Sequence, residues 1–137
     1  MVSMKEELDD ETRYALVQYR LQRAKQTLAE VPVLREQNFL STAINRMYYA
    51  SFYAASALLL NEHHNVSTHQ GVKQQLGLHF VVTGKLSRDM GKYFSQIFEA
   101  RHSSDYDDFI STTVEEIDEY YPKAQKFIEA VEGLLKP

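Results

Sequence analysis

The 137-residue sequence contains no cysteine and no tryptophan, and only five glycines and three prolines. The lack of cysteine excludes disulfide scaffolds, cysteine-zinc sites and thiol catalysis. Because glycine and proline favour turns, their scarcity predicts a few long elements instead of many short strands. The length suits one domain, so we expect a single all-α domain over residues 1–137.

The sequence also lacks an excess of positive charge and a long apolar run. It has 15 Lys and Arg against 19 Asp and Glu, a formal net charge of -4, which argues against nucleic-acid binding by bulk electrostatics and leaves room for a local basic patch. The best apolar run, residues 47–60, is shorter than the roughly 18 residues of a membrane span. The acidic N-terminal segment does not resemble a signal peptide. We therefore expect a cytoplasmic protein without membrane contact.

Apolar residues recur every three or four positions along four segments, which is the period of an amphipathic helix. These segments are residues 4–31, closed by Pro32, residues 40–59, the region of Met90 to Phe98, and residues 114–135. The second segment is apolar on most sides, which is typical of a central helix. With one short helix between the second and third segments, the pattern predicts an up-and-down bundle of four principal helices plus one short helix.

Local signals place the ends of these helices. The short helix is expected to begin at Ser67, Thr68 or His69 and to stop at Gly84. The polar cluster at residues 102–105 should end or loosen the third principal helix.

Two further signals concern the last helix. Ser111 or Thr112 is expected to cap it, with Glu115 or Glu116 completing a capping box. Pro122 removes one backbone donor within the helix, so we expect a kink or a break shortly before it.

Arg101 is the most informative polar residue. Ile97, Phe94 and Met90 lie 4, 7 and 11 positions before it, so its guanidinium projects from the core-facing stripe of the third principal helix. An unpaired guanidinium would be costly to bury. In one interpretation an acid such as Asp105 neutralises it, and the arginine is structural.

In the other interpretation Arg101 belongs to a site at the end of this helix. Arg101, His102, Asp105 and Tyr106 would gather there and bind a phosphate. Because histidine ordinarily titrates near neutral pH, His102 beside Arg101 would also suit phosphodiester chemistry.

A second polar group interrupts the central helix. Asn45 and Arg46 precede Tyr48, Tyr49 and Tyr53. One interpretation is that the tyrosine hydroxyls are satisfied by these polar neighbours or by the first helix. The other places Arg46 and Tyr49, three positions apart, in the wall of a groove shared with Arg101.

The histidines do not have metal-ligand spacing. His63 and His64 are sequential, and neither His69 nor His79 has another ligand three or four positions away, so we expect surface or loop roles. Walker-type loops, GxSxG elbows, HExxH pairs and EF-hand loops are also absent. We expect neither a metal nor another cofactor.

Four ordered motifs carry a family resemblance over nearly the whole chain. They are Asn45-Arg46-Met47-Tyr48-Tyr49-Ala50 with its continuation to residue 59, and residues 68–72, 80–84 and 101–108. Together they resemble the HEPN superfamily (higher eukaryotes and prokaryotes nucleotide-binding). More narrowly, the chain is similar to small stand-alone prokaryotic HEPN proteins with an N-R-x-Y-Y-A central helix and an R-x-x-x-D-Y-D signature.

The resemblance implies a helical bundle, usually a homodimer, with the arginine end of the third principal helix near the dimer cleft. It also implies that many members are metal-independent ribonucleases, often toxins neutralised by a small nucleotidyltransferase partner. Their motif is an arginine, a polar residue and a later histidine. Arg101 and His102 match the first two positions, but Tyr106, Asp107 and Asp108 stand where the later histidine is expected.

Three hypotheses follow. In the first, the chain binds a nucleotide, RNA or a nucleotidyltransferase partner in a toxin-antitoxin-like pair through Arg101, Asp105, Arg46 and Tyr49, with weak or no catalysis. In the second, it is an active metal-independent ribonuclease that uses Arg101 with His102 or Tyr106. In the third, it is a structural bundle in which Arg101 and Asp105 form a salt bridge.

Overall fold

A computed structural model describes residues 8–107 and 111–135 of the chain. Within these ranges the structure is helical and has no strand, which confirms the all-α prediction. None of the described helices is both long and apolar enough to cross a membrane. The elements are α1 (Asp10–Ala29), α2 (Val31–Glu36), α3 (Leu40–Asn61), α4 (His69–Leu76), the π-helical η1 (Gly77–Val81), α5 (Arg88–Tyr106) and α6 (Val114–Leu135).

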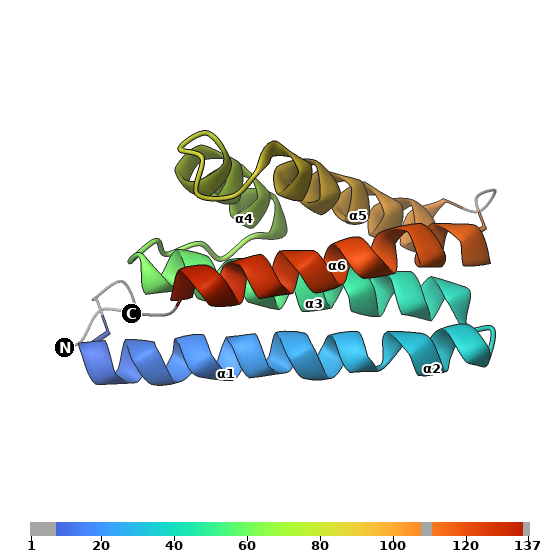
Figure 1. The fold of residues 1–137 in the computed structure, drawn as a ribbon, viewed down its shortest axis with the longest axis horizontal. Coiled ribbons are helices and arrows are strands. Elements are labelled where there is room, and N and C mark those ends of the chain that lie inside the picture. The colour runs from blue at the N-terminus through green and yellow to red at the C-terminus, as the bar shows by residue number, and fades with distance from the viewer. Residues whose placement is uncertain (1–7, 108–110, 136–137) are drawn as a thin grey trace.

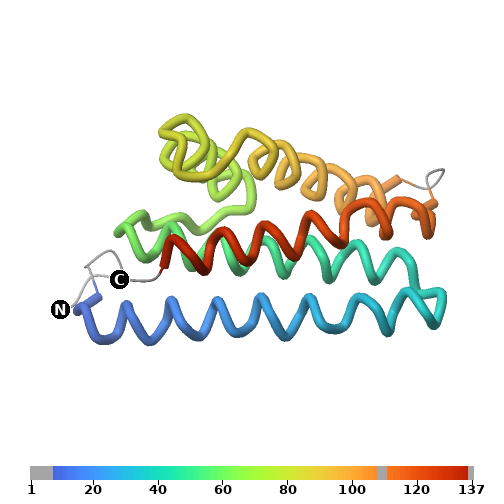
Figure 2. The backbone as a smooth tube through the Cα atoms, viewed as in Figure 1, coloured from blue at the N-terminus to red at the C-terminus, as the bar shows by residue number. Residues whose placement is uncertain are grey.

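The long helices alternate in direction and surround α3. Figure 1 shows α1 and α2 end to end along one edge, α6 beside α3, and α4 and α5 along the opposite edge. The tube in Figure 2 shows α1, α3, α5 and α6 running up and down in turn. Helix α3 packs against α1, α2, α4, α5 and α6, so the segment that is apolar on most sides is central, as predicted.

The core consists of the apolar stripes that the outer helices turn toward α3. Ala43, Ile44, Met47 and Ala50 of α3 are fully buried, and the small alanines let the neighbouring helices approach closely. The largest side chains buried among them are Tyr48, Tyr93, Phe80, Phe94 and Phe127. Burial of these rings is the main source of stability in a fold of this kind.

The first predicted helix is two helices in the structure. Asp9 caps α1 by accepting from the Thr12 backbone amide at 2.7 Å, and residues 4–7 of the prediction lie outside the described residues. Pro32 does not end a helix but lies in the first turn of α2, where its missing N–H has no intrahelical partner to lose. Tyr14, placed on the predicted apolar seam, is 66% exposed because Arg13, four positions before Val17 and 7% exposed, takes the inward-facing position in that turn of α1.

Helix α4 follows the sequence at its start and departs from it at its end. The Thr68 side chain caps α4 by accepting from the Gly71 amide at 2.9 Å, so Thr68 is the cap among the three candidates. The helix continues into η1 and stops at Val81, before Gly84. Gly84 has a φ of 82° in the turn that follows, a conformation that glycine adopts without strain.

Neither α5 nor α6 is interrupted at the position where the sequence predicts that the helix ends or breaks. The polar residues 102–105 do not end α5, which runs through to Tyr106. Pro122 does not break α6, which is continuous from Val114 to Leu135. The capping box of α6 pairs Thr113 with Glu116: the Thr113 hydroxyl accepts from the Glu116 amide at 3.2 Å, and the Glu116 carboxylate accepts from the Thr113 amide at 3.2 Å.

Candidate functional site

The guanidinium of Arg101 lies among three tyrosine rings. Its central carbon is 5.3 Å from the ring centre of Tyr48, 5.6 Å from that of Tyr49 and 5.9 Å from that of Tyr106. Its Nη2 also donates to the Tyr49 hydroxyl at 3.4 Å. The periodicity prediction was right about its direction, because the side chain turns inward and is only 18% exposed. Aromatic faces thus replace part of the water around a permanent cation.

Asp105 balances the charge of Arg101 but does not occupy all of its hydrogen-bond donors. The Nε of Arg101 is 3.0 Å from Oδ2 of Asp105, one helical turn later, and the Asp105 side chain is 29% exposed. The contact is electrostatic, because the buried Nε–H is not aligned for a hydrogen bond with any acceptor among the described residues. The ion pair of the structural interpretation is present, and the guanidinium retains hydrogen-bonding capacity.

Arg46 brings a second guanidinium to the same place. Its central carbon lies 5.3 Å from the ring centre of Tyr49, and its Nε and Nη2 donate to Asn45 Oδ1 at 3.2 and 2.9 Å. Tyr49 therefore has two cations within 5.6 Å of its ring centre, while Asp105 balances one of them. The result is a local positive patch on a chain whose net charge is -4.

His69 joins this group from α4, and the prediction of a surface or loop role is wrong for it. Its Nδ1 is 2.6 Å from the Tyr48 hydroxyl, and its ring stacks on Phe52 at 4.4 Å between ring centres. The signal that could have located it is the spacing of His69, Val72 and Leu76, which puts all three on one face of α4. Val72 and Leu76 are both buried, so that face is the inner one.

The surroundings keep His69 and Tyr48 uncharged at neutral pH. Burial lowers the pKa of His69 below its ordinary 6.5, and the positive charge of Arg101 lowers it further. Tyr48 has no exposed surface, and burial raises the pKa of its hydroxyl well above the ordinary value of 10, with Arg101 opposing part of that rise. The inner side of the patch thus consists of a neutral phenol and a neutral imidazole.

His102 lies on the outer side of α5. It is exposed, and its ring centre is 4.9 Å from that of Tyr106, which is itself 67% exposed. Its connection to Arg101 therefore passes through Tyr106. Tyr53, the third tyrosine of the sequence pattern, accepts from Arg23 of α1 at 3.1 Å, as expected if the first helix satisfies its hydroxyl.

The remaining histidines form a separate pair. The rings of His64 and His79 stack at 3.8 Å, and His79 Nε2 is 2.7 Å from the Gln75 side-chain oxygen. In the part of the chain that the structure describes, no three His, Asp or Glu side chains converge as metal ligands would.

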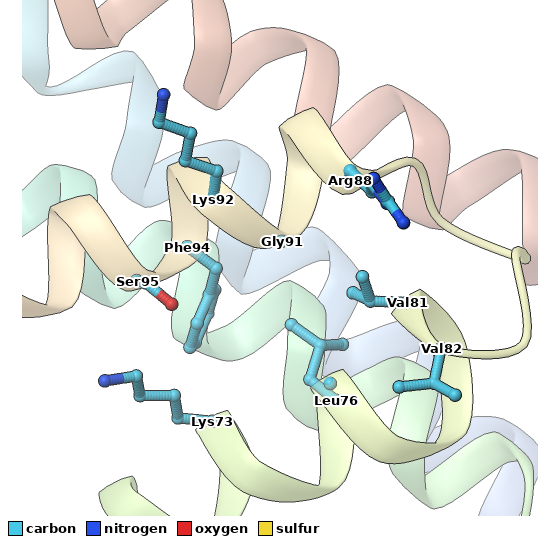
Figure 3. A pocket seen from close by; sticks show the side chains of 10 residues that line it. Lys73, Leu76, Val81, Val82, Arg88, Gly91, Lys92, Phe94 and Ser95 are labelled. Atoms are coloured by element: carbon cyan, nitrogen blue, oxygen red, sulfur yellow. The ribbon is translucent and has the colours of Figure 1, made fainter.

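A cavity of about 300 Å³ lies between the α4–η1 segment and α5 (Figure 3). Its apolar lining includes Leu76, Val81 and Phe94, and Lys73 and Arg88 contribute basic side chains. Arg101 and the residues around it do not line this cavity.

The residues around Arg101 are referred to below as the Arg101 cluster. Its members are Arg46, Tyr48, Tyr49, His69, Arg101 and Asp105. Two guanidinium groups beside aromatic faces suit a ligand with a phosphate and a ring to stack. The members of the Arg101 cluster come from α3, α4 and α5, and the packing of these helices brings them together.

Comparisons with known proteins identify the family of the chain. A family model described as the HEPN domain matches residues 17–134. A Thermotoga maritima protein named "UPF0332 protein" is 35% identical over 88% of this chain and 92% of its own length. Two Methanocaldococcus jannaschii proteins, "Putative toxin MJ0605" and "Putative toxin MJ0142", are 30% and 28% identical over 88% and 84% of this chain, covering 89% and 78% of their own lengths. Since the family model covers most of the sequence, this chain belongs to the HEPN domain family.

Proposed function

We propose that the Arg101 cluster binds the phosphate backbone of single-stranded RNA, and that the chain does so as one member of a toxin-antitoxin-like pair. The observation that carries the proposal is the placement of two guanidinium groups, from Arg46 and Arg101, on the ring of Tyr49. Arginine binds phosphate oxygens through paired N–H donors, and bases stack on aromatic rings. A patch of this kind binds an anion despite the acidic composition of the chain.

Asp105 fits this role as an orienting group. It contacts Nε of Arg101, while Nη2 lies near Tyr49. A guanidinium held at one edge loses less conformational freedom when a phosphate arrives at another edge. Asp105 also offsets one positive charge, so binding relies on directed donors more than on bulk attraction.

We propose that catalysis is weak or absent. General acid-base catalysis requires a group that takes up and releases protons near the operating pH. Within the cluster, burial and Arg101 hold the pKa of His69 down and burial holds that of Tyr48 up. At Tyr106 and Asp107, where the family motif leads us to expect a histidine, the side chains have different chemistry; Asp108 lies outside the described residues.

A metal-independent ribonuclease is the second candidate, and one contact favours it. The ring of His102 lies 4.9 Å from Tyr106, and Tyr106 lies 5.9 Å from Arg101, so a substrate across Tyr106 would reach both. In this case His102 would supply the proton transfer and Arg101 would stabilise charge on the phosphate. Cleavage that disappears in His102→Ala would establish this alternative.

The family resemblance also leads us to propose a homodimer and a small nucleotidyltransferase partner. The word toxin in the names of the two archaeal relatives supports the paired context. Large apolar side chains on the surface, among them Leu78 and Val82, support association. Light scattering should give about twice the monomer mass of 15.9 kDa, and co-expression with a nucleotidyltransferase encoded beside this gene should yield a complex.

Fluorescence anisotropy with a fluorescein-labelled single-stranded RNA in EDTA tests the binding function. Arg101→Ala should weaken binding at least about 10-fold, since a hydrogen bond to a charged group is lost, and Arg46→Ala should weaken it less. Arg35→Ala is the matched control, because Arg35 pairs with Asp118 between α2 and α6. Gel analysis of the same samples reports cleavage. Equal affinity of wild type and Arg101→Ala would leave the structural bundle as the better account.

A further inference from the structure

His69 is a member of the Arg101 cluster to which the proposed function assigns no separate role. It is the first residue of α4 and packs beside Tyr48, Tyr49 and Phe52 of α3. The stack on Phe52 has an interplanar angle of 21°, and the Tyr48 hydroxyl lies 2.6 Å from Nδ1. One ring face and one ring nitrogen are thus held by α3, which fixes the orientation of the imidazole.

Tyr48 determines which nitrogen of His69 carries the proton. Tyr48 is fully buried and remains a phenol because burial raises its pKa. A buried phenol needs an acceptor, and Nδ1 of His69 is at hydrogen-bond distance. The Tyr48 hydroxyl therefore donates to Nδ1, and the neutral imidazole carries its proton on Nε2.

The Nε2–H group is directed away from Tyr48. The two nitrogens of an imidazole point in diverging directions, so a ring whose Nδ1 faces Tyr48 turns Nε2 to the other side. Among the described residues, Nε2 has no hydrogen-bond partner. His69 thus offers a neutral donor whose position is set by the core.

Arg101 lies beside the same two rings as His69. The Tyr48 ring centre is 5.3 Å from the guanidinium carbon and 5.7 Å from the His69 ring centre, and the Tyr49 ring centre is 5.6 and 5.8 Å from them. A phosphodiester has two non-bridging oxygens that accept hydrogen bonds. Two donors flanking one pair of rings match that ligand.

We propose that His69 is a phosphate-binding residue, whose Nε2–H donates to one non-bridging oxygen while Arg101 binds the other. The inference rests on the proposed RNA-binding function and adds a specific donor to it. The Tyr48 hydrogen bond also excludes His69 as a general base in this arrangement, because Nε2 carries a proton and the Nδ1 lone pair is occupied. His69 therefore does not replace the histidine that the family motif lacks here.

The experiment reads the imidazole directly. In protein labelled with ¹⁵N-histidine, long-range ¹H–¹⁵N spectra distinguish the two neutral tautomers, first without ligand, then with inorganic phosphate and then with the single-stranded RNA. We expect the Nε2–H tautomer for His69 at pH 7 and a shift of its Nε2 resonance with both additions. The histidine at position 79, which is paired with Gln75, serves as the internal reference.

Two variants complete the test. His69→Phe preserves the ring stack on Phe52 and removes the donor, so RNA affinity should fall about 5- to 20-fold. Tyr48→Phe preserves the ring but removes the hydroxyl, so the Nδ1–H tautomer should become populated and affinity should fall less. Arg35→Ala should bind as wild type does. Circular dichroism checks that each variant is folded, and the wild-type spectra stand even if a variant is not.

The outcomes separate the inference from the function on which it rests. RNA binding that depends on Arg101 but neither shifts Nε2 of His69 nor weakens in His69→Phe would overturn the inference and leave the function standing. An Nδ1–H tautomer in the free protein would also overturn it. A phosphate-induced Nε2 shift without RNA binding would support His69 and reject the RNA function. No response to either ligand would reject both.

Discussion

Replacing Arg101 by alanine should lower the free energy of unfolding by about 1–2 kcal/mol. The ion pair with Asp105 spans one helical turn between side chains that are 18% and 29% exposed, and pairs of this type contribute roughly 0.3–0.5 kcal/mol after screening by solvent. One cation shared among three rings at 5.3 to 5.9 Å adds about 1 kcal/mol. The net stabilisation by Arg101 is limited, because its Nε–H is buried without a hydrogen bond and this offsets part of the gain.

Urea unfolding at pH 7 measures this loss, and a double-mutant cycle with Asp105→Asn separates the ion pair from the rings. The coupling free energy between positions 101 and 105 should be about 0.5 kcal/mol. Arg35→Ala is the comparison for an exposed pair without rings, because Arg35 binds Asp118 through Nε and Nη2 at 2.6 and 2.8 Å. The free energy of unfolding of Arg35→Ala should be lower than that of the wild type by no more than about 1 kcal/mol.

The structural interpretation of Arg101 makes a different forecast. Removing one partner of a fully buried pair costs roughly 3–5 kcal/mol, because the other charge is left without compensation. A loss of that size, with a coupling free energy of several kcal/mol, would show that Arg101 is retained to hold the fold. The phosphate-binding proposal would then lose its main support.

Three further predictions concern pH and packing. Folding lowers the pKa of His69 below 6.5, so the unfolded chain binds more protons than the folded protein at pH values below 6.5. The free energy of unfolding should therefore fall as the pH is lowered through 6.5. Urea unfolding at a series of pH values should show a smaller fall in His69→Phe. Tyr93→Phe should cost about 1 kcal/mol, because the buried Ser51 hydroxyl keeps its 3.0 Å hydrogen bond to the Met47 carbonyl, whereas Ser51→Ala should cost about 2 kcal/mol, because the buried Tyr93 hydroxyl then loses its 2.7 Å partner; calorimetry would contradict this if the order were reversed. Gly91→Ala should destabilise by about 1–3 kcal/mol despite the helix preference for alanine, because the new methyl would lie 2.8 Å from a Val81 methyl; an increase in melting temperature would disprove the clash.

The sequence predicts the long helices well because each has apolar residues spaced three or four positions apart, which lie on one face only if the segment is helical. Residues 117, 124, 128 and 131 of α6 show this period, and all four are buried. Helix ends are harder, because Ser111, Thr112 and Thr113 have the same capping chemistry and only the folded backbone selects one of them. Pro32 is similarly ambiguous, since proline both ends helices and begins them.

The contacts of the Arg101 cluster can be predicted from the sequence only in part, because some lie within one helix and others join two helices. The i,i+4 spacing of Arg101 and Asp105 fixes their ion pair within one helix, so local reasoning finds it. The contact of His69 with Tyr48 joins α4 to α3, and the residues that connect these two helices have no apolar periodicity. Its register depends on how α4 packs on α3, which is a tertiary property that periodicity does not determine.

The central position of α3 has a consequence for how the cluster moves. Tyr48, Tyr49 and Phe52 belong to α3, which packs against α1, α2, α4, α5 and α6, whereas His69 and Arg101 come from α4 and α5, which have fewer neighbours. Amide hydrogen exchange should therefore be slowest in α3 and faster in α4, whose unfolding exposes less apolar surface. The rings of Tyr48, Tyr49 and Phe52 are then rigid before a ligand arrives, and the side chains of His69 and Arg101 already rest against them. A ligand held this way loses little affinity to reorganisation of the protein.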